Sequence, residues 1–438
     1  MTRMKESGID WIGQMPEEWE SGKVKYFSKI SAGATPDRNN LLFWNGDINW
    51  MSSGEVNQEI VKYTAETITN LALKKSSTKL LPIGTVMLAM NGQGKTKGTV
   101  AILAIETASN QSLASFIVDG NRLNNQYLYY FFKAGYSYIR GLKGEDRDGL
   151  NLQLVSNITV LLFDIKEQQK IADFLDKRTT QLDKVKSLLE EQIQKLYAYR
   201  ASLIYETVTK GLDKTVPMKD SGIDWIGQLP EGWGVSKLKF TLEKVSNNIK
   251  VGPFGSSLSG DAIRSSGKWV YNQRNVLDNN FTETDTFISD AKWKELKNFS
   301  VVSGDILLTT RGTIGRIAIV PKDYFEGILH PCLMKFRVDS HIVQPRLIKY
   351  FFNDTTLVKE QLKFLSNSTT IDVIYSYNLK NIIIPIIPLE EQYGIVEYLD
   401  KQCSNVDALI KVKQEQIDNI NKQRQTLIYD YVTGKRRV

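Results

Sequence analysis

Two nearly identical stretches decide how this chain is organised: residues 4–16 read MKESGIDWIGQMP, and residues 218–230 read MKDSGIDWIGQLP. Eleven of the 13 positions are identical, and a Trp follows each stretch three residues further on. A second pair of matching segments ends each copy, YETVTKG at 205–211 and YDYVTG at 429–434. The chain therefore consists of one unit of about 215 residues written twice.

The end of each copy has the pattern of a long helix. Residues 168–210 contain no Pro or Gly, and apolar residues recur there at spacings of three, four or seven. Moving 224 residues along the chain keeps seven of the eight positions apolar, with Lys413 as the exception. The stripe comprises Ile171, Leu175, Leu182, Val185, Leu189, Ile193, Leu196 and Leu203, and then Ile395, Leu399, Val406, Leu409, Ile417, Ile420 and Leu427. This spacing predicts two long helices that pack on each other as an antiparallel coiled coil.

The middle of each copy has short runs of Val, Ile, Thr and aromatic residues broken by Gly, Asn and Asp. Residues 85–89 and 305–309 are typical of strands, and residues 127–133 and 346–352 of short helices. We therefore expect an α+β protein with a pseudo-twofold internal repeat. Its predicted parts are a globule at 1–165, a helix at 166–212, a second globule at 213–389 and a second helix at 390–438.

Composition excludes several classes of protein. Two cysteines, Cys332 and Cys403, are too few for a disulfide framework, and with His330 and His341 they do not make a four-ligand zinc site. The longest apolar stretch is far shorter than the roughly 20 residues of a membrane helix. We expect a cytoplasmic protein. The net charge of +7, from 56 basic and 49 acidic residues, is only a mild indication of an anionic partner.

Motifs for catalysis or metal binding fail in this sequence. AMNGQGKT at 89–96 lacks the first Gly of a phosphate loop, a strand-like KGTVAIL follows it, and the second copy has no Lys-Thr pair. VLLFD at 160–164 has IPIIP at 384–388 as its counterpart, so both read as core strands. We interpret His330 and Cys332 as a surface His beside a buried Cys. No metal site and no catalytic residues are expected in this chain.

Polar loops with basic residues remain in the middles of both copies. Arg, Lys, Asn and Gln on such loops can donate hydrogen bonds to phosphates and to base edges, although ordinary solvated loops have the same composition. The candidate DNA-binding residues are Asn91, Gln93, Lys95, Lys97, Lys143, Arg147, Ser256, Ser257, Asn272, Arg274, Arg311, Thr313 and Arg316. We expect a further polar loop at residues 367–370, NSTT.

These features occur in the same order in both copies, and in this order the sequence resembles the specificity subunit of type I restriction-modification systems. The marks are GATP at 33–36, WNGDINW at 44–50, GPFGSSL at 252–258, GDILL at 304–308 and the Glu-Gln pairs at 167–168 and 391–392. The resemblance covers the whole chain.

The resemblance implies a DNA-binding subunit without catalytic activity. Each globule would be a target recognition domain for one half of an asymmetric bipartite site in double-stranded DNA. The helices would space the globules and dock two methyltransferase subunits. Those partners would carry S-adenosylmethionine and methylate adenine, and translocase-nuclease subunits would use ATP and magnesium for restriction. This chain itself would hold no cofactor.

Two rival functions stay open at this point. A coiled-coil adaptor with two protein-binding globules also accounts for the helices, and a self-contained enzyme would need motifs that the sequence lacks. We also expect the segment at Trp11 to pack near the end of the C-terminal helix, and Trp225 to pack near the first helix.

Overall fold

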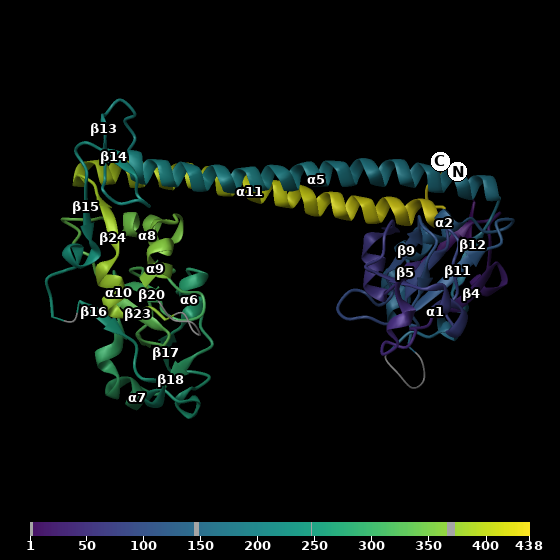
Figure 1. Cartoon of the computed structure of the whole chain (residues 1–438), viewed down its shortest axis with the longest axis horizontal. Coiled ribbons are helices and arrows are strands. Elements are labelled where there is room, and N and C mark those ends of the chain that lie inside the picture. Colours follow the sequence, from purple (N-terminus) through teal and green to yellow (C-terminus); the bar gives the residue numbers. More distant parts are fainter. Residues whose placement is uncertain (1–2, 144–148, 247, 366–372) are drawn as a thin grey trace. The chain divides into compact units, whose positions relative to one another are not determined.

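The computed structural model describes residues 3–143, 149–246, 248–365 and 373–438 (Figure 1). The chain divides into two compact units, one formed by Met1–Glu190 with Gln414–Val438 and the other by Glu191–Lys413. Two long helices, α5 (Ile165–Lys210) and α11 (Leu389–Val432), each supply one part to each unit. The structure thus has two domains and mixed α and β content, with a long central helix of 46 residues.

The first unit contains a five-stranded sheet of order β4-β11-β8-β9-β6 and a three-stranded sheet of order β10-β5-β7, and β1 pairs with β2 and β3 with β12. The strands are β1 (Met4–Glu6), β2 (Gln14–Pro16), β3 (Glu20–Lys23), β4 (Ser28–Ala32), β5 (Trp44–Met51), β6 (Ile60–Val61), β7 (Glu66–Ile68), β8 (Val86–Ala89), β9 (Val100–Leu103), β10 (Ala108–Ser109), β11 (Leu113–Val118) and β12 (Thr159–Leu162). The short helices are α1 (Asn70–Lys75), α2 (Asn125–Ala134), α3 (Tyr136–Gly141) and α4 (Leu152–Ser156).

The second unit contains one sheet of order β16-β23-β20-β21 and one of order β18-β17-β22-β19, and β13 pairs with β14 and β15 with β24. The strands are β13 (Met218–Asp220), β14 (Gln228–Pro230), β15 (Gly234–Lys237), β16 (Ile249–Val251), β17 (Lys268–Tyr271), β18 (Phe287–Ile288), β19 (Ser300–Val301), β20 (Ile306–Thr309), β21 (Ile317–Ile319), β22 (Gly327–Leu329), β23 (Leu333–Phe336) and β24 (Ile383–Ile386). The short helices are α6 (Gln273–Leu277), α7 (Asp290–Glu295), α8 (Pro345–Asn353), α9 (Leu357–Leu365) and α10 (Ser376–Asn381).

The two units repeat one topology. The order β4-β11-β8-β9 has the same connectivity as β16-β23-β20-β21, and β10-β5-β7 the same as β22-β17-β18. The quoted repeat segments fold as equivalent hairpins, in which Met4 faces Pro16 and Met218 faces Pro230. The predicted strands at 85–89 and 305–309 and the short helices at 127–133 and 346–352 are confirmed as β8, β20, α2 and α8.

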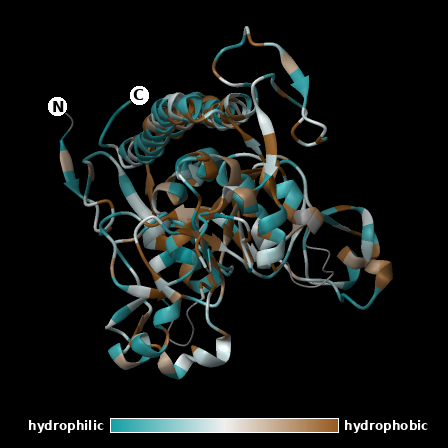
Figure 2. Cartoon of the chain, turned by 90° about the vertical axis from the view of Figure 1, so that its left-hand side faces the viewer, coloured by the Kyte–Doolittle hydropathy of each residue, from teal (hydrophilic) through white to brown (hydrophobic). Residues whose placement is uncertain are grey.

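Each unit has a core of its own that includes parts of both long helices. In the first unit, Tyr127 and Phe132 of α2 cluster with Ile171 of α5 and with Val432 of α11. In the second, Phe351 of α8 belongs to a cluster that also contains Ile204 and Val208 of α5, and Ile395 and Leu399 of α11. Apolar residues gather in the interior of the globule, while the long helices are largely hydrophilic outside (Figure 2). Burying these apolar side chains fixes where each globule meets the helices.

Within each unit, residue numbers rise along α5 as they fall along the neighbouring α11. In the first unit, Phe174 packs on Tyr431 with ring centroids 4.5 Å apart, and the Arg424 Nε lies 3.1 Å from an Asp183 oxygen. In the second unit, the Lys413 Nζ donates to Gln192 at 2.6 Å, and Arg200 contacts Asp407 at 3.3 Å.

The helices end where glycine changes the backbone direction. Helix α5 stops at Lys210 before Gly211, and α11 stops at Val432 before Gly434, with φ values of +71° and +72°. A left-handed residue just after the last turn is a common helix terminus. The second helix therefore does not continue to residue 438 as expected.

The apolar stripe is only partly buried. Ile171, Leu175, Ile395 and Leu399 are fully buried, and Ile193, Val406 and Ile417 nearly so. Leu182, Leu196, Leu203 and Leu427 are half-buried. The equivalent Val185 and Leu409 are about half exposed, at 47% and 51%, so the expectation that they pack between the helices is wrong. A seven-residue apolar spacing drifts around a straight α-helix, which turns these positions away from the contact.

The segment near Trp11 packs as expected against the end of α11. The Trp11 and Tyr429 rings lie 6.2 Å apart, and the Tyr429 hydroxyl donates to the Ile12 carbonyl at 3.2 Å. In the second unit the segment of Trp225 also lies near the end of the first helix, because the adjacent Ile226 belongs to the core cluster that contains Ile204 and Val208 of α5. The Trp225 side chain itself is 40% exposed. In the described part of the chain, no helix is long and apolar enough to cross a membrane.

Candidate nucleic-acid interface

Backbone and side-chain contacts join three loops of the first unit. A Cβ on Gly33 would lie 1.9 Å from the Ser109 carbonyl oxygen, so only glycine permits this approach. The Thr35 hydroxyl donates to the Gln111 side-chain oxygen at 2.7 Å, and the Met90 amide donates to Ser112 at 2.8 Å. The segments 33–40, 90–98 and 109–112 therefore form one connected surface, which we call the first loop surface.

The predicted residues of this surface lie on a loop that is held by its backbone. Arg140 of α3 donates to the Gly94 carbonyl at 2.7 Å and to the Lys97 carbonyl at 3.1 Å, and the Tyr136 hydroxyl donates to the Lys95 carbonyl at 2.9 Å. Asn91, Gln93 and Lys95 are exposed and Lys97 is half-buried. Because side chains of α3 hold the loop through its backbone carbonyls, the exposed side chains of the loop remain available to a ligand.

Two predicted groups near this loop differ in their status. Lys143 is exposed just after α3. Arg147 lies outside the described residues, as do residues 367–370 in the second copy.

The second unit joins its loops in a similar way. A Cβ on Gly252 would lie 2.3 Å from the His330 carbonyl oxygen, the counterpart of the Gly33 contact. The Thr310 hydroxyl donates to the Cys332 carbonyl at 2.9 Å, and the Gln273 side chain reaches the Thr313 carbonyl at 3.4 Å. Segments 252–258, 272–274, 310–316 and 330–332 form the second loop surface.

Most predicted residues of the second loop surface are exposed, but three of them have structural contacts, including Arg274, which lies 3.5 Å from an Asp278 oxygen. Ser256, Arg274, Arg311 and Thr313 are exposed, and Ser257 is half-buried. Asn272 is the N-cap of α6 and accepts from the Arg274 amide at 2.9 Å. The half-buried Arg316 donates to the Asn353 carbonyl at 2.7 Å, at the end of α8.

His330 and Cys332 contact each other inside the second loop surface. The His330 Nδ1 lies 2.9 Å from the Cys332 sulfur, and both side chains are half-buried, so the expectation of a surface His beside a buried Cys is wrong. Burial, followed by the charge of Arg311, lowers the pKa of His330, and burial raises the pKa of Cys332. Both pKa shifts favour the uncharged form of the group. Among the described residues, no group of His, Cys, Asp and Glu could hold a metal ion.

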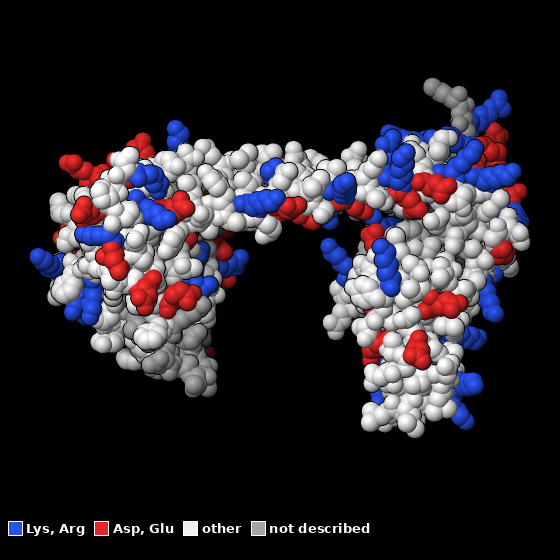
Figure 3. All heavy atoms as spheres, turned by 45° about the horizontal axis from the view of Figure 1, so that its top comes forward, with Lys and Arg blue, Asp and Glu red and all other residues white. Residues whose placement is uncertain are grey.

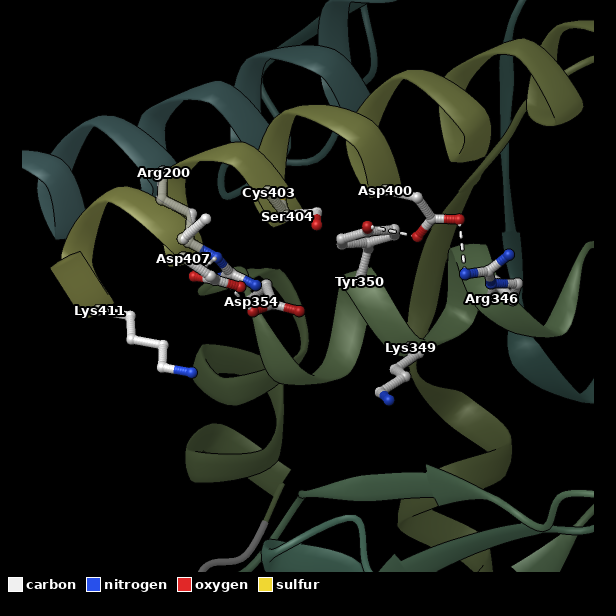
Figure 4. Close-up of a pocket in the computed structure, with 11 residues that line it drawn as sticks. Arg200, Arg346, Lys349, Tyr350, Asp354, Asp400, Cys403, Ser404, Asp407 and Lys411 are labelled. Atoms are coloured by element: carbon white, nitrogen blue, oxygen red, sulfur yellow. Dashed lines mark hydrogen bonds and ion pairs between the residues drawn. The ribbon is translucent and has the colours of Figure 1, made fainter.

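A partly buried arginine joins the long helices to the globule in each unit. In the second unit, Arg200 of α5 donates to Asp354 of the globule at 2.7 Å and contacts Asp407 of α11, beside a cavity of 580 Å³ (Figure 4). In the first unit, Arg424 of α11 binds Glu59 at 2.8 Å and Asp183 of α5 at 3.1 Å. The two arginines hold equivalent places, so each globule is tied to both helices by charge.

Neighbouring side chains strengthen these junctions. Tyr350 points at Asp400 in Figure 4 and donates to it at 2.8 Å, and Tyr130 donates to Asp176 at 2.5 Å in the first unit. Lys133 lies 2.6 Å from Glu59, and burial lowers the pKa of its ammonium group to about 8.

The Glu-Gln pairs at the helix starts have a clear structural role that the sequence did not reveal. Gln168 and Gln392 are fully buried. Gln168 donates to the carbonyls of Arg122 and Phe163, each at 2.9 Å, and accepts from the Asn124 amide. Gln392 makes the same three contacts in the second unit. A buried amide that is satisfied in this way fixes the helix start to the globule.

Charge on the surface is mixed. Lys and Arg are interspersed with Asp and Glu in the view of Figure 3, with no broad face of one sign. This agrees with the small net charge of +7. An anionic ligand would then be held by particular loop residues more than by a general positive field.

The fold and the two loop surfaces define a two-domain binding protein whose domains share a topology and differ in their loops. The model of the family described as "Type I restriction modification DNA specificity domain" matches residues 16–196 and 233–421, and the chain belongs to this family.

Similar proteins agree with this assignment. The chain is 24% identical to the MjaVIII specificity subunit of a type I restriction enzyme from Methanocaldococcus jannaschii, over 97% of this chain and 94% of the relative. The EcoR124I/EcoR124II specificity subunit from Escherichia coli is 27% identical over 43% of this chain and 48% of the relative. The protein is therefore a DNA-specificity subunit and not a catalytic subunit.

Solved structures share the fold. A chain from a study of assembly and conformational transition of the type I R-M system superposes with a TM-score of 0.73 at 16% identity, covering 96% of this chain and 99% of that one. The HsdS subunit from Thermoanaerobacter tengcongensis gives a TM-score of 0.54 at 15% identity, covering 96% and 98%.

Proposed function

We propose that this subunit recognises an asymmetric bipartite site in double-stranded DNA, one half per globule, and directs adenine methylation and restriction by partner subunits. The observation that carries the proposal is the repeated topology with different loops. Asn91, Gln93 and Lys95 occupy the place that Arg311 and Thr313 occupy in the other unit. Equal scaffolds with unequal loops fit two half-sites of different sequence.

The target recognition domains in this proposal are residues 1–165 and 213–389. Helices α5 and α11, which lie in the segments 166–212 and 390–438, form an antiparallel coiled coil, and a pseudo-twofold axis relates the copies. The opposed residue order of the α5 and α11 contacts in each unit supports this arrangement, as do the equivalent places of Arg200 and Arg424. Half-site separation follows from the protein geometry in such binders.

Apolar side chains exposed on the helices support partner docking. Val185 and Leu188 of α5 are 47% and 48% exposed, and their counterparts Leu409 and Val412 of α11 are both 51% exposed. Two matching apolar patches on one chain fit two copies of the same partner, because apolar side chains at an interface exclude water when covered. The partners here are two methyltransferase subunits.

The cofactors belong to the partners in this proposal. The methyltransferase subunits carry S-adenosylmethionine, and translocase-nuclease subunits carry ATP and magnesium. This chain contributes sequence specificity alone.

A gel-shift experiment tests the proposal. The chain co-expressed with a methyltransferase subunit should shift duplex DNA, and the affinity should fall steeply with salt because phosphate contacts release counterions. A coiled-coil adaptor that binds only proteins would give no shift at any salt concentration. Incubation of the chain alone with DNA, S-adenosylmethionine, ATP and magnesium should give no methylation and no cleavage.

A further inference from the structure

Arg38 lies on the first loop surface in an unusually well-defined position. Its Nη2 donates to the Glu66 Oε2 at 2.9 Å, and its Nη1 donates to the other oxygen of the same carboxylate. The guanidinium carbon lies 3.9 Å from the centre of the Trp44 ring. The Arg38 side chain is nevertheless 52% exposed. A carboxylate and an aromatic face thus hold an exposed guanidinium in one orientation.

The loop that carries Arg38 is itself fixed. The Trp44 indole donates to the Asp37 carbonyl and the Trp50 indole to the Ala34 carbonyl, each at 3.1 Å. Ala34 in turn donates to Ser109, so the loop belongs to the same surface as Asn91 and Gln93. Arg38 therefore lies among the residues that we assign to DNA contact.

The guanidinium has donors left for a ligand. Arginine has five N–H donors, and the contact with Glu66 uses two of them. Within the described residues, no partner other than Glu66 accepts a hydrogen bond from Arg38. The edge formed by Nε and one Nη fits two acceptors side by side, which is the pattern of guanine O6 and N7 in the major groove.

The second copy lacks this arrangement. Strands β17 and β18 stand where β5 and β7 stand in the first copy. There Trp269 stacks on Phe325 at 4.6 Å and meets the edge of Phe287 at 6.4 Å. Asp285, two residues before Phe287, pairs with Arg274 there, but this arginine comes from the segment after β17, lies 4.0 Å from the carboxylate and is 78% exposed. Each copy therefore presents an arginine from a different loop and with different support, as base-reading residues must where the two half-sites differ.

We propose that Arg38 reads a guanine in the half-site bound by the first globule, with Glu66 and Trp44 holding its guanidinium in the reading position. The proposal rests on the proposed function, because it assigns one residue of the first loop surface to one base. Glu66 and Trp44 are positioning residues, since they act on DNA through Arg38.

The test is a map of methylated adenines in cells that carry the chain with its methyltransferase partner. The variants are Arg38→Ala and Glu66→Gln. Arg122→Ala is the matched control, because Arg122 also pairs with a glutamate, Glu20, at 2.9 Å and lies over an aromatic ring, that of Phe27, at 5.2 Å. The Arg122 side chain is 56% exposed, and its ion pair lies outside the first loop surface.

With Arg38→Ala, one G·C position in one half-site should become degenerate, with discrimination falling roughly 10- to 100-fold, while the other half-site stays unchanged. Arg122→Ala should keep the wild-type motif. Glu66→Gln should relax the same position by roughly 3- to 10-fold, and it carries the test if Arg38→Ala does not fold.

Three results would overturn the assignment. The first is an unaltered motif in both Arg38→Ala and Glu66→Gln. The second is an equal loss of methylation on every sequence, which would mark Arg38 as a phosphate contact. The third is a wild-type motif without a G·C pair in either half. A wild-type chain that directs no methylation at all would instead refute the proposed function.

Discussion

Gln392 should be among the most important polar side chains for the stability of the second unit. It is fully buried at the start of α11, and its side-chain oxygen accepts from the Gln344 amide at 2.8 Å. Its amide nitrogen donates to the Ile342 carbonyl at 2.9 Å and to the Ile387 carbonyl at 2.7 Å. Gln392→Ala removes all three bonds and leaves three backbone groups without these partners.

The expected loss follows from that count. A hydrogen bond contributes about 1 kcal/mol net, and a buried group left without a partner costs about 1–3 kcal/mol. Gln392→Ala should therefore lower the free energy of unfolding of the second unit by about 3 kcal/mol. Gln168→Ala should have an effect of similar size on the first unit, because its three contacts are equivalent.

Urea unfolding combined with hydrogen exchange on the full chain measures this, since exchange in β24 and at the start of α11 reports on the second unit alone. Gln416→Ala is the matched control, because Gln416 is an exposed glutamine on the same helix. If Gln392→Ala and Gln416→Ala agree within about 0.5 kcal/mol, the role assigned to the buried glutamine is wrong.

Four further predictions concern the long helices, Arg311, Arg316 and the partly buried Lys133. Inserting seven residues into α5 between Gln192 and Arg200, and seven into α11 between Asp407 and Lys413, adds about 10 Å of helix. The unspecified DNA spacer in the methylation map should then grow by about three base pairs at 3.4 Å each. An unchanged spacer would refute the proposal that the helices set the separation of the two half-sites. Arg311→Ala should weaken DNA binding in a gel shift and either relax one half-site or reduce the salt slope by about one, whereas unaltered affinity would remove Arg311 from the interface. Arg316→Ala should also weaken binding, and because its guanidinium holds the end of α8 it should cost about 1 kcal/mol in a urea titration as well. The pKa of Lys133 is about 8 in the folded protein, below the ordinary value of 10.5. Between pH 8 and pH 10.5, Lys133 therefore carries its proton in the unfolded chain but has mostly lost it in the folded one. Wild-type stability should therefore rise from pH 8 to pH 10 relative to Lys133→Met, by about 2 kcal/mol, and equal pH slopes would contradict the shift.

The sequence predicts the two copies and the two long helices well, because repeats and periodicity are visible in the local sequence. The SGIDWIGQ segments and the long Pro-free stretches are visible without any tertiary contact. The stripe is less reliable at Val185 and Leu409, since a linear spacing does not reveal how far a helix turns away from its partner.

The candidate site was predicted as a set of loops but not as a set of contacts. Arg38 and Glu66 are 28 residues apart, and no local pattern indicates that they meet. The sequence places Arg316 and Asn272 in polar loops, but it does not reveal that both side chains make structural hydrogen bonds. Arg316 donates to the end of α8, and Asn272 accepts from the start of α6. The Glu-Gln pairs were visible at the helix starts, but their role depends on backbone carbonyls that only the fold brings close.

One measurement shows most directly whether this chain reads two different half-sites. Methylated adenines are sequenced in DNA from cells that carry this subunit with its methyltransferase partner, and in DNA from cells that carry the partner alone. Methylation should occur in a single bipartite motif, with two unlike halves at a fixed separation, and only when the subunit is present. Methylation in a continuous or palindromic motif, or a pattern that does not depend on the subunit, would contradict this expectation.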